Sequence, residues 1–131
     1  MTIDRPTAEN EFNRFKEAMR LRLNREGMDE NDRRDVNEDV EIIIGEIMAG
    51  RVSIDDDGRA TLHLAEGDPL TFNKPNGRAV AVIDKKKESH KVGQQYAVIG
   101  AITNTAPSVI AGLDWADIDV CASIIGLFFV R

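Results

Sequence analysis

The spacing of apolar residues changes twice along the chain, and this change limits the folds that the chain can adopt. Over the first fifty residues apolar positions recur every three or four residues, as they do on one face of an amphipathic helix. They form two groups, Phe12, Phe15, Met19 and Leu23, and then Val36, Val40, Ile43, Ile44 and Ile47. We predict a helical hairpin, with Thr7 capping the first helix, Gly27 ending it and Gly50 ending the second.

A period of two follows Gly50 and indicates strands. Apolar and polar residues alternate over residues 52–54 and again over residues 60–64. A third extended segment, residues 70–72, lies between two groups of turn-forming residues. Alternation of this kind is typical of strands with one buried face. We therefore predict a small antiparallel sheet of two or three strands.

Three consecutive carboxylates, Asp55, Asp56 and Asp57, precede Gly58 between the first two strands. Clustered aspartates suggest a calcium loop, but the EF-hand pattern places acidic residues at alternate positions and glycine at the sixth. Gly58 comes too early for that pattern. We interpret the four residues as a tight turn.

Helical spacing returns in the last third of the chain. Apolar residues at positions 80–83 and 96–102 predict two helices, and Pro107 predicts a turn after them. Asp114 suits the N-cap of a final helix, with Asp117 in its first turn. We predict one α+β domain over residues 1–131, composed of an N-terminal helical hairpin (1–50), a β-hairpin or small antiparallel β-sheet of two to three strands (51–73) and C-terminal helices (77–131).

The charge of the chain disfavours nucleic acid as a partner, because the net charge is −6. Residues 1–10 lack the basic start and apolar run of a signal peptide, and the apolar run at 124–130 is too short to cross a bilayer. The single cysteine, Cys121, cannot form an internal disulfide. We expect a cytoplasmic protein that binds neither nucleic acid nor a membrane.

Residues capable of chemistry are scattered along the chain. His63 occupies a strand position that faces solvent, and His90 has no second histidine or cysteine at ligand spacing. Cys121 lies among apolar neighbours, where a thiol has a raised pKa, and Ser108 has no partner that would activate it. We expect no catalytic residue, no metal and no cofactor.

The final helix is apolar around nearly its whole circumference, so it needs cover on more than one side. The rest of the domain could supply that cover, or part of the helix is an interface, for instance in a homo-oligomer. The lysine cluster Lys85, Lys86, Lys87 and Lys91 is a solvated helix end or a contact for an acidic protein surface. Our partner-binding candidates are Trp115, Ile118, Ile125, Phe128, Phe129, Lys85, Lys86 and Lys87.

Residues 60–131 resemble the tail assembly chaperone family of long-tailed bacteriophages, including its Mu-like members. The matching features are the strands Thr61-Leu62 and Leu70-Thr71-Phe72, the turn at Lys74-Pro75 and the helix start Gly77-Arg78-Ala79-Val80, which runs to Ile83-Asp84-Lys85. They continue with the apolar helix over residues 97–103, Ala106-Pro107, Leu113 with Asp117 and Asp119, and the terminal Phe128-Phe129. The helical hairpin at the N-terminus is not part of this resemblance.

The resemblance implies a cytosolic helper that binds the tape measure protein and the tail tube protein during phage tail assembly. A chaperone of long helical proteins needs an apolar surface that it can expose and cover reversibly. Two other functions stay open at this point. One is a virion structural protein, such as a minor tail or connector subunit, and the other is an enzyme of an unrecognised family.

Overall fold

The computed structural model describes residues 2–21, 23, 29–75 and 91–128, and it confirms the α+β class. The predicted helix at 78–83, the charged break with Lys85, Lys86 and Lys87, and Phe129 lie outside these residues. The elements, in chain order, are α1 (Arg5–Met19), α2 (Glu30–Met48), β1 (Val52–Ile54), β2 (Ala60–Leu62), β3 (Leu70–Phe72), α4 (Lys91–Thr103), α5 (Pro107–Ala111) and α6 (Trp115–Phe128).

Helix α1 begins earlier than the sequence predicted. Asp4, not Thr7, is the N-cap, and its Oδ1 accepts a hydrogen bond of 2.9 Å from the Thr7 backbone N–H. Pro6 lies in the first turn, where a missing N–H costs nothing because those amides have no partner within the helix. The prediction of a Thr7 cap was therefore wrong.

The end of α1 also differs from the prediction, because the helix stops at Met19. Arg20 adopts a left-handed conformation with φ of 54°. The Leu21 N–H donates to the Lys16 carbonyl at 3.0 Å, and the Arg20 N–H donates to the Glu17 carbonyl, which is the Schellman arrangement. This reversal brings Leu21 and Leu23 against the edge of the core. Gly27, the predicted stop, lies outside the described residues.

Helix α2 ends where the sequence predicted, since Gly50 follows it with φ of 81°. Asp29 caps the start of α2 by accepting a hydrogen bond of 2.8 Å from the Asp32 N–H. The Ile3 N–H donates to the Met48 carbonyl, so the chain that enters α1 is fastened to the end of α2. This hydrogen bond joins the start of α1 to the end of α2 across the hairpin.

The three strands form one antiparallel sheet in the order β1-β2-β3. Ser53, Thr61 and Thr71 pair across it and share one face, whereas the opposite face is buried. The buried face consists of Val52, Ala60, Leu62, Leu70 and Phe72. Strand β1 contacts α1 and α2, and β3 contacts α4, so this small sheet connects the N-terminal hairpin to the C-terminal helices.

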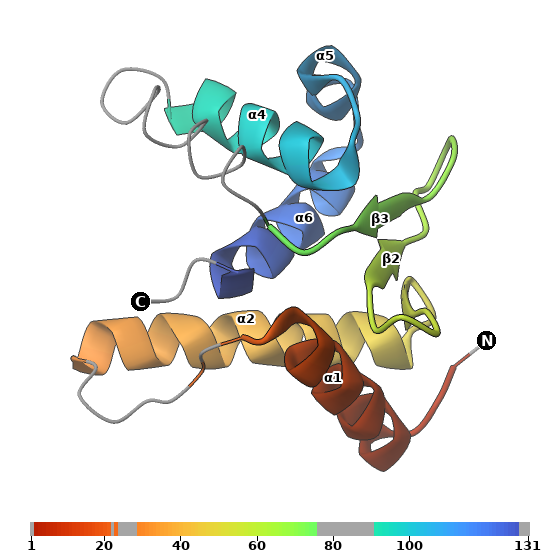
Figure 1. The fold of residues 1–131 in the computed structure, drawn as a ribbon, viewed down its shortest axis with the longest axis vertical. Coiled ribbons are helices and arrows are strands. Elements are labelled where there is room, and N and C mark those ends of the chain that lie inside the picture. Colours follow the sequence, from red (N-terminus) through yellow and green to blue (C-terminus); the bar gives the residue numbers. More distant parts are fainter. Residues whose placement is uncertain (1, 22, 24–28, 76–90, 129–131) are drawn as a thin grey trace.

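Helix α6 lies between α2 and α4 (Figure 1). Its buried side chains include Cys121, Ile124 and Leu127, which join one hydrophobic cluster with residues from both hairpin helices, the sheet, α4 and α5. The rest of the domain therefore supplies most of the cover that this apolar helix needs. Among the described residues, no helix is both long and apolar enough to cross a membrane.

Pro107 begins a helix, α5, whereas the sequence predicted only a turn there. Proline at the first helical position loses no hydrogen bond, so it is compatible with a helix start. Helix α4 ends at Thr103 with Asn104 left-handed at φ of 56°, as the spacing of its apolar residues predicted. Helix α5 lies beside α4 and leads through a short turn into α6 (Figure 1).

Candidate protein-binding surface

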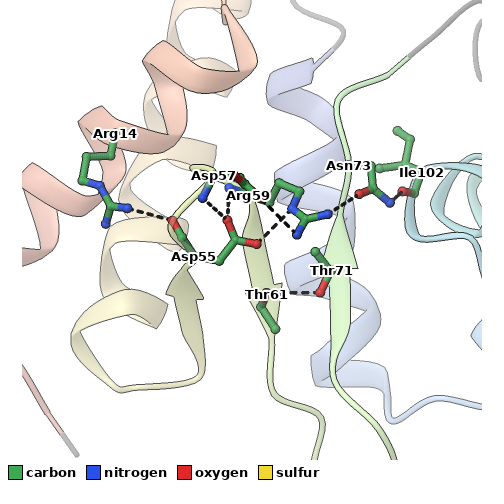
Figure 2. Close-up of polar contacts among 8 residues, drawn as sticks. All are labelled: Arg14, Asp55, Asp57, Arg59, Thr61, Thr71, Asn73 and Ile102. Atoms are coloured by element: carbon green, nitrogen blue, oxygen red, sulfur yellow. Dashed lines mark hydrogen bonds and ion pairs between the residues drawn. The ribbon is translucent and has the colours of Figure 1, made fainter.

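The aspartates between β1 and β2 form the predicted tight turn. Asp55 Oδ1 accepts hydrogen bonds of 2.9 Å from the backbone N–H groups of Asp57 and Arg59, and its Oδ2 lies 2.9 Å from Arg59 Nε (Figure 2). Burial alone would raise the pKa of the Asp55 carboxyl, but the hydrogen bonds and charge of Arg59 outweigh it and lower that pKa. These contacts use the carboxylate for local structure.

The same turn is joined to both helical parts of the molecule. Arg14 Nη2 of α1 donates to the Asp55 carbonyl at 2.7 Å, and Arg59 Nη1 donates to Asn73 Oδ1 at 3.2 Å (Figure 2). Asn73 Nδ2 in turn donates to the Ile102 carbonyl of α4 at 3.0 Å. This chain of polar contacts crosses the sheet and connects α1 with α4.

A serine and a histidine lie close together on the sheet. Ser53 Oγ is 3.0 Å from His63 Nε2, a distance at which imidazole can act as a base towards a hydroxyl. Both side chains are exposed, so His63 points to solvent as the sequence predicted. Catalysis would also require donors that stabilise charge in a site shielded from water. On this open face we interpret the pair as a contact between neighbouring strands.

Cys121 is completely buried in α6. Burial, with a smaller effect from the charge of Asp117, raises the pKa of its thiol to about 12. The thiolate is the reactive form of cysteine, so Cys121 is a poor nucleophile in the folded protein. The structure thus places Cys121 as the sequence predicted, among apolar neighbours.

Two aspartates support the first turn of α6. Asp114 Oδ1 accepts a hydrogen bond of 3.0 Å from the Ala116 N–H, which confirms the predicted N-cap. Asp117 is buried, and its Oδ2 accepts a hydrogen bond of 3.2 Å from the Ala65 N–H beyond β2. Within the described part of the chain, no group of histidine, cysteine and carboxylate side chains could hold a metal ion.

A half-buried carboxylate, Asp39, lies where α2 crosses α6. It is hydrogen-bonded to the Ser123 side chain, and a Cβ atom at Gly126 would lie 2.6 Å from its Oδ2. Burial raises the pKa of Asp39 to about 6 against the hydrogen bond from Ser123, and the charges of Asp35, Glu38 and Asp119 raise it further. Because the position sits in the main contact between the hairpin and α6, its protonation affects the stability of that contact.

The partner-binding candidates have very different surroundings. Trp115 is 77% exposed, whereas Ile118, one turn further along α6, is only 6% exposed and contributes to the interior. Ile125 is half-buried. Phe128 packs on the core, with its ring 5.8 Å from the ring of Phe15 in an edge-to-face contact. Of these four, only Trp115 offers a large apolar surface to solvent.

Sequence reasoning missed the second large exposed side chain of this region, Val109 of α5, which is 53% exposed. Val109 and Trp115 flank the short turn between α5 and α6, in which the Gly112 N–H donates to the Val109 carbonyl. A usable signal was the lack of lysine and arginine from residue 92 to residue 130. We refer to the exposed residues Ala101, Ala106, Pro107, Val109, Trp115 and Ala116 as the α5 surface.

The α5 surface contains a hollow of about 400 Å³ between α4 and α5. Its lining consists of small and uncharged residues, namely Ala97, Gly100, Ala101, Asn104, Thr105, Ala106 and Pro107. Gly100 is required there, because a Cβ atom at this position would lie 2.5 Å from the Thr105 carbonyl oxygen. The described region thus combines a projecting aromatic ring with an uncharged hollow.

Comparison with protein families, with curated proteins and with solved structures found no match to this chain.

Proposed function

We propose that this protein is a non-enzymatic protein-binding factor of phage tail morphogenesis, acting in the host cytoplasm. Its partners would be the tape measure protein, which it would chaperone, and the tail tube protein. The observation that supports a binding role is the exposure of Trp115, which leaves 77% of the largest apolar side chain in contact with water. The tail assembly role comes from the resemblance of residues 60–131 to that chaperone family.

An exposed tryptophan favours binding for an energetic reason. An aromatic side chain removes roughly 150–250 Å² from water when it is buried, and tryptophan is enriched among the few residues that dominate interface energies. Trp115 lies on the first turn of α6, whose start is capped by Asp114, so little backbone entropy is lost when a partner covers it. A position on a capped helix therefore suits an anchor residue.

The other candidate residues take different parts in this proposal. Ile118 and Phe128 support α6 from the inside, and Ile125 is only partly accessible. Lys85, Lys86, Lys87 and Phe129 lie outside the described residues and stay predictions from the sequence, as does self-association. We therefore assign the main contact to Trp115 and the α5 surface.

Co-expression with the tape measure protein of the same phage tests the function. Purification of the tape measure protein should retain this chain, and Trp115→Ala should reduce the retained amount at least about tenfold, as expected for an interface anchor. Ile42→Ala is a matched control, because Ile42 is also a large apolar residue at the surface, 38% exposed, but lies on α2. Retention of both variants would contradict the assignment to Trp115, and finding this chain in purified virions would favour the virion structural alternative.

A further inference from the structure

Two exposed carboxylates flank the aromatic anchor of the α5 surface. Asp114 and Asp119, both exposed, precede and follow Trp115 on the first turns of α6. Within the described residues neither carboxylate lies in an ion pair, whereas Arg5, Arg51 and Arg59 elsewhere each pair with a carboxylate. No lysine or arginine occurs between Lys91 and Arg131. The surface is therefore apolar at its centre and acidic beside its aromatic anchor.

This distribution of charge disfavours a second copy of the chain as the occupant. A symmetric dimer through the α5 surface would bring Asp114 and Asp119 of both copies into one interface. The whole chain also carries a net charge of −6, so two copies repel each other at longer range. Opposed charges, by contrast, increase the rate and the specificity of association.

The shape of the surface sets the second requirement for a partner. Small residues around the hollow, among them Gly100, Ala101 and Ala106, allow the backbone of a partner segment to approach closely. The hollow of about 400 Å³ accepts aliphatic side chains, and Trp115 projects into solvent from the start of α6. A helix that lays one apolar face on such a surface is a recurrent mode of recognition.

We propose that the α5 surface docks an amphipathic helix of a partner protein, with lysine or arginine residues next to the apolar face of that helix. Trp115 packs on the apolar face, aliphatic side chains of the partner enter the hollow, and the basic residues pair with Asp114 and Asp119. This inference rests on the proposed protein-binding function and adds the chemistry of the partner.

The test uses two synthetic amphipathic helices that share a leucine face and differ only in carrying lysine or glutamate on the polar face. Trp115 is the single tryptophan of the chain, so its fluorescence reports on this surface alone. We expect the lysine peptide to shift the emission to shorter wavelength. The glutamate peptide should bind at least about tenfold more weakly, which corresponds to about 1.4 kcal/mol.

Variants locate the binding site by anisotropy of the labelled lysine peptide. Trp115→Ala should weaken binding about tenfold or more, and Asp114→Asn with Asp119→Asn should weaken it several-fold, since asparagine keeps the N-cap and removes only the charge. Glu17→Gln with Asp56→Asn changes the net charge equally but lies on α1 and the β1–β2 turn, so it should bind as the parent protein does.

Four results would overturn the inference: equal affinity for the two peptides, no binding of either peptide, undiminished binding by Trp115→Ala, or an equal loss in the two charge variants. An emission shift that depends on protein concentration alone would also overturn it, in favour of a second copy as the occupant. If the tape measure protein retains this chain in the co-expression test and any of these results is obtained, the partner chemistry is contradicted and the proposed function stands. If the tape measure protein does not retain this chain but the lysine peptide binds as expected, the proposed function is contradicted instead.

Discussion

At the scale of single residues, burial determines chemical reactivity, and Cys121 is the clearest case. Its side chain is fully buried, and the raised pKa keeps the thiol protonated near neutral pH. We expect a thiol reagent to leave the native protein unmodified and to label Cys121 only as the protein unfolds. Stoichiometric labelling without denaturant, with the far-ultraviolet circular dichroism unchanged, would show that α6 is open to solvent.

Asp39 carries a second expectation at the residue scale. Its folded pKa of about 6 lies above the unfolded value of about 3.9, so the folded state binds the proton more tightly. The resulting stabilisation is complete below about pH 4 and is lost as the pH rises through about 6. Asp39→Asn resembles the protonated form, so it should stabilise the protein by about 1–2 kcal/mol at pH 7, after allowance for solvent screening.

Urea unfolding of Asp39→Asn and the parent protein at pH 4 and pH 7 measures this effect. The difference in the free energy of unfolding should appear at pH 7 and nearly vanish at pH 4. Carboxyls with lowered pKa values, such as Asp55, affect both proteins equally and cancel in this difference. An equal difference at the two pH values would mean that Asp39 is ionised normally in the folded state.

At the scale of elements, the contact between the β1–β2 turn and α1 depends on Gly58. This residue has φ of 82°, and a Cβ atom there would lie 2.2 Å from the Cβ of Ala18. Gly67 is a matched control, because it has φ of 98° and a Cβ atom there would meet no other segment within 4 Å. Both alanine variants incur the backbone cost of about 1–2 kcal/mol, so Gly58→Ala should lose at least about 1 kcal/mol more than Gly67→Ala. Equal losses in urea melts would show that the turn does not press on α1.

The two ends of α6 also lead to opposite expectations. Phe128 packs edge-to-face on Phe15, whereas Trp115 has few contacts in the domain. Phe128→Ala should reduce the free energy of unfolding by about 2–3 kcal/mol, somewhat less than a fully buried phenylalanine, and Trp115→Ala should change it by less than about 0.5 kcal/mol. Thermal melts of both variants check this order. The reverse order would restore Phe128 as a binding residue and place Trp115 in the interior.

For the whole molecule, the sheet and the Asp55–Arg59–Asn73 contacts join the N-terminal hairpin to α4. One hydrophobic cluster also includes residues from the hairpin, the sheet and the C-terminal helices. We therefore expect a single cooperative transition in urea, with circular dichroism and Cys121 labelling reporting the same midpoint. Labelling of Cys121 well before the loss of helix would mean that α6 leaves the hairpin as a separate unit.

Local interactions account for the features that the sequence predicted correctly. Apolar periodicity predicted the hairpin, a small sheet of two or three strands and the last helix, because side-chain direction repeats every 3.6 residues in a helix and every two in a strand. Gly50 and Asp114 were identified as helix ends because their roles require only neighbouring backbone groups. The errors at Thr7, at the end of α1 and at Pro107 also concern helix ends, where alternative caps differ by about 1 kcal/mol or less.

Contacts between distant segments decided the rest, and these include the candidate site. The sequence indicated that α6 is apolar on nearly all sides, but only the packing of α6 within the domain decides that Ile118 is buried and Trp115 exposed. The same packing sets Asp39 against Gly126 and presses Gly58 on Ala18. The exposure of a side chain and the pKa of a carboxyl depend on which surfaces meet. Because the hydrophobic effect is non-directional, a local pattern of apolar residues does not show which surfaces these will be. The sequence therefore determined the hairpin, the sheet and the last helix, and the tertiary structure determined which of their apolar residues are left for a partner.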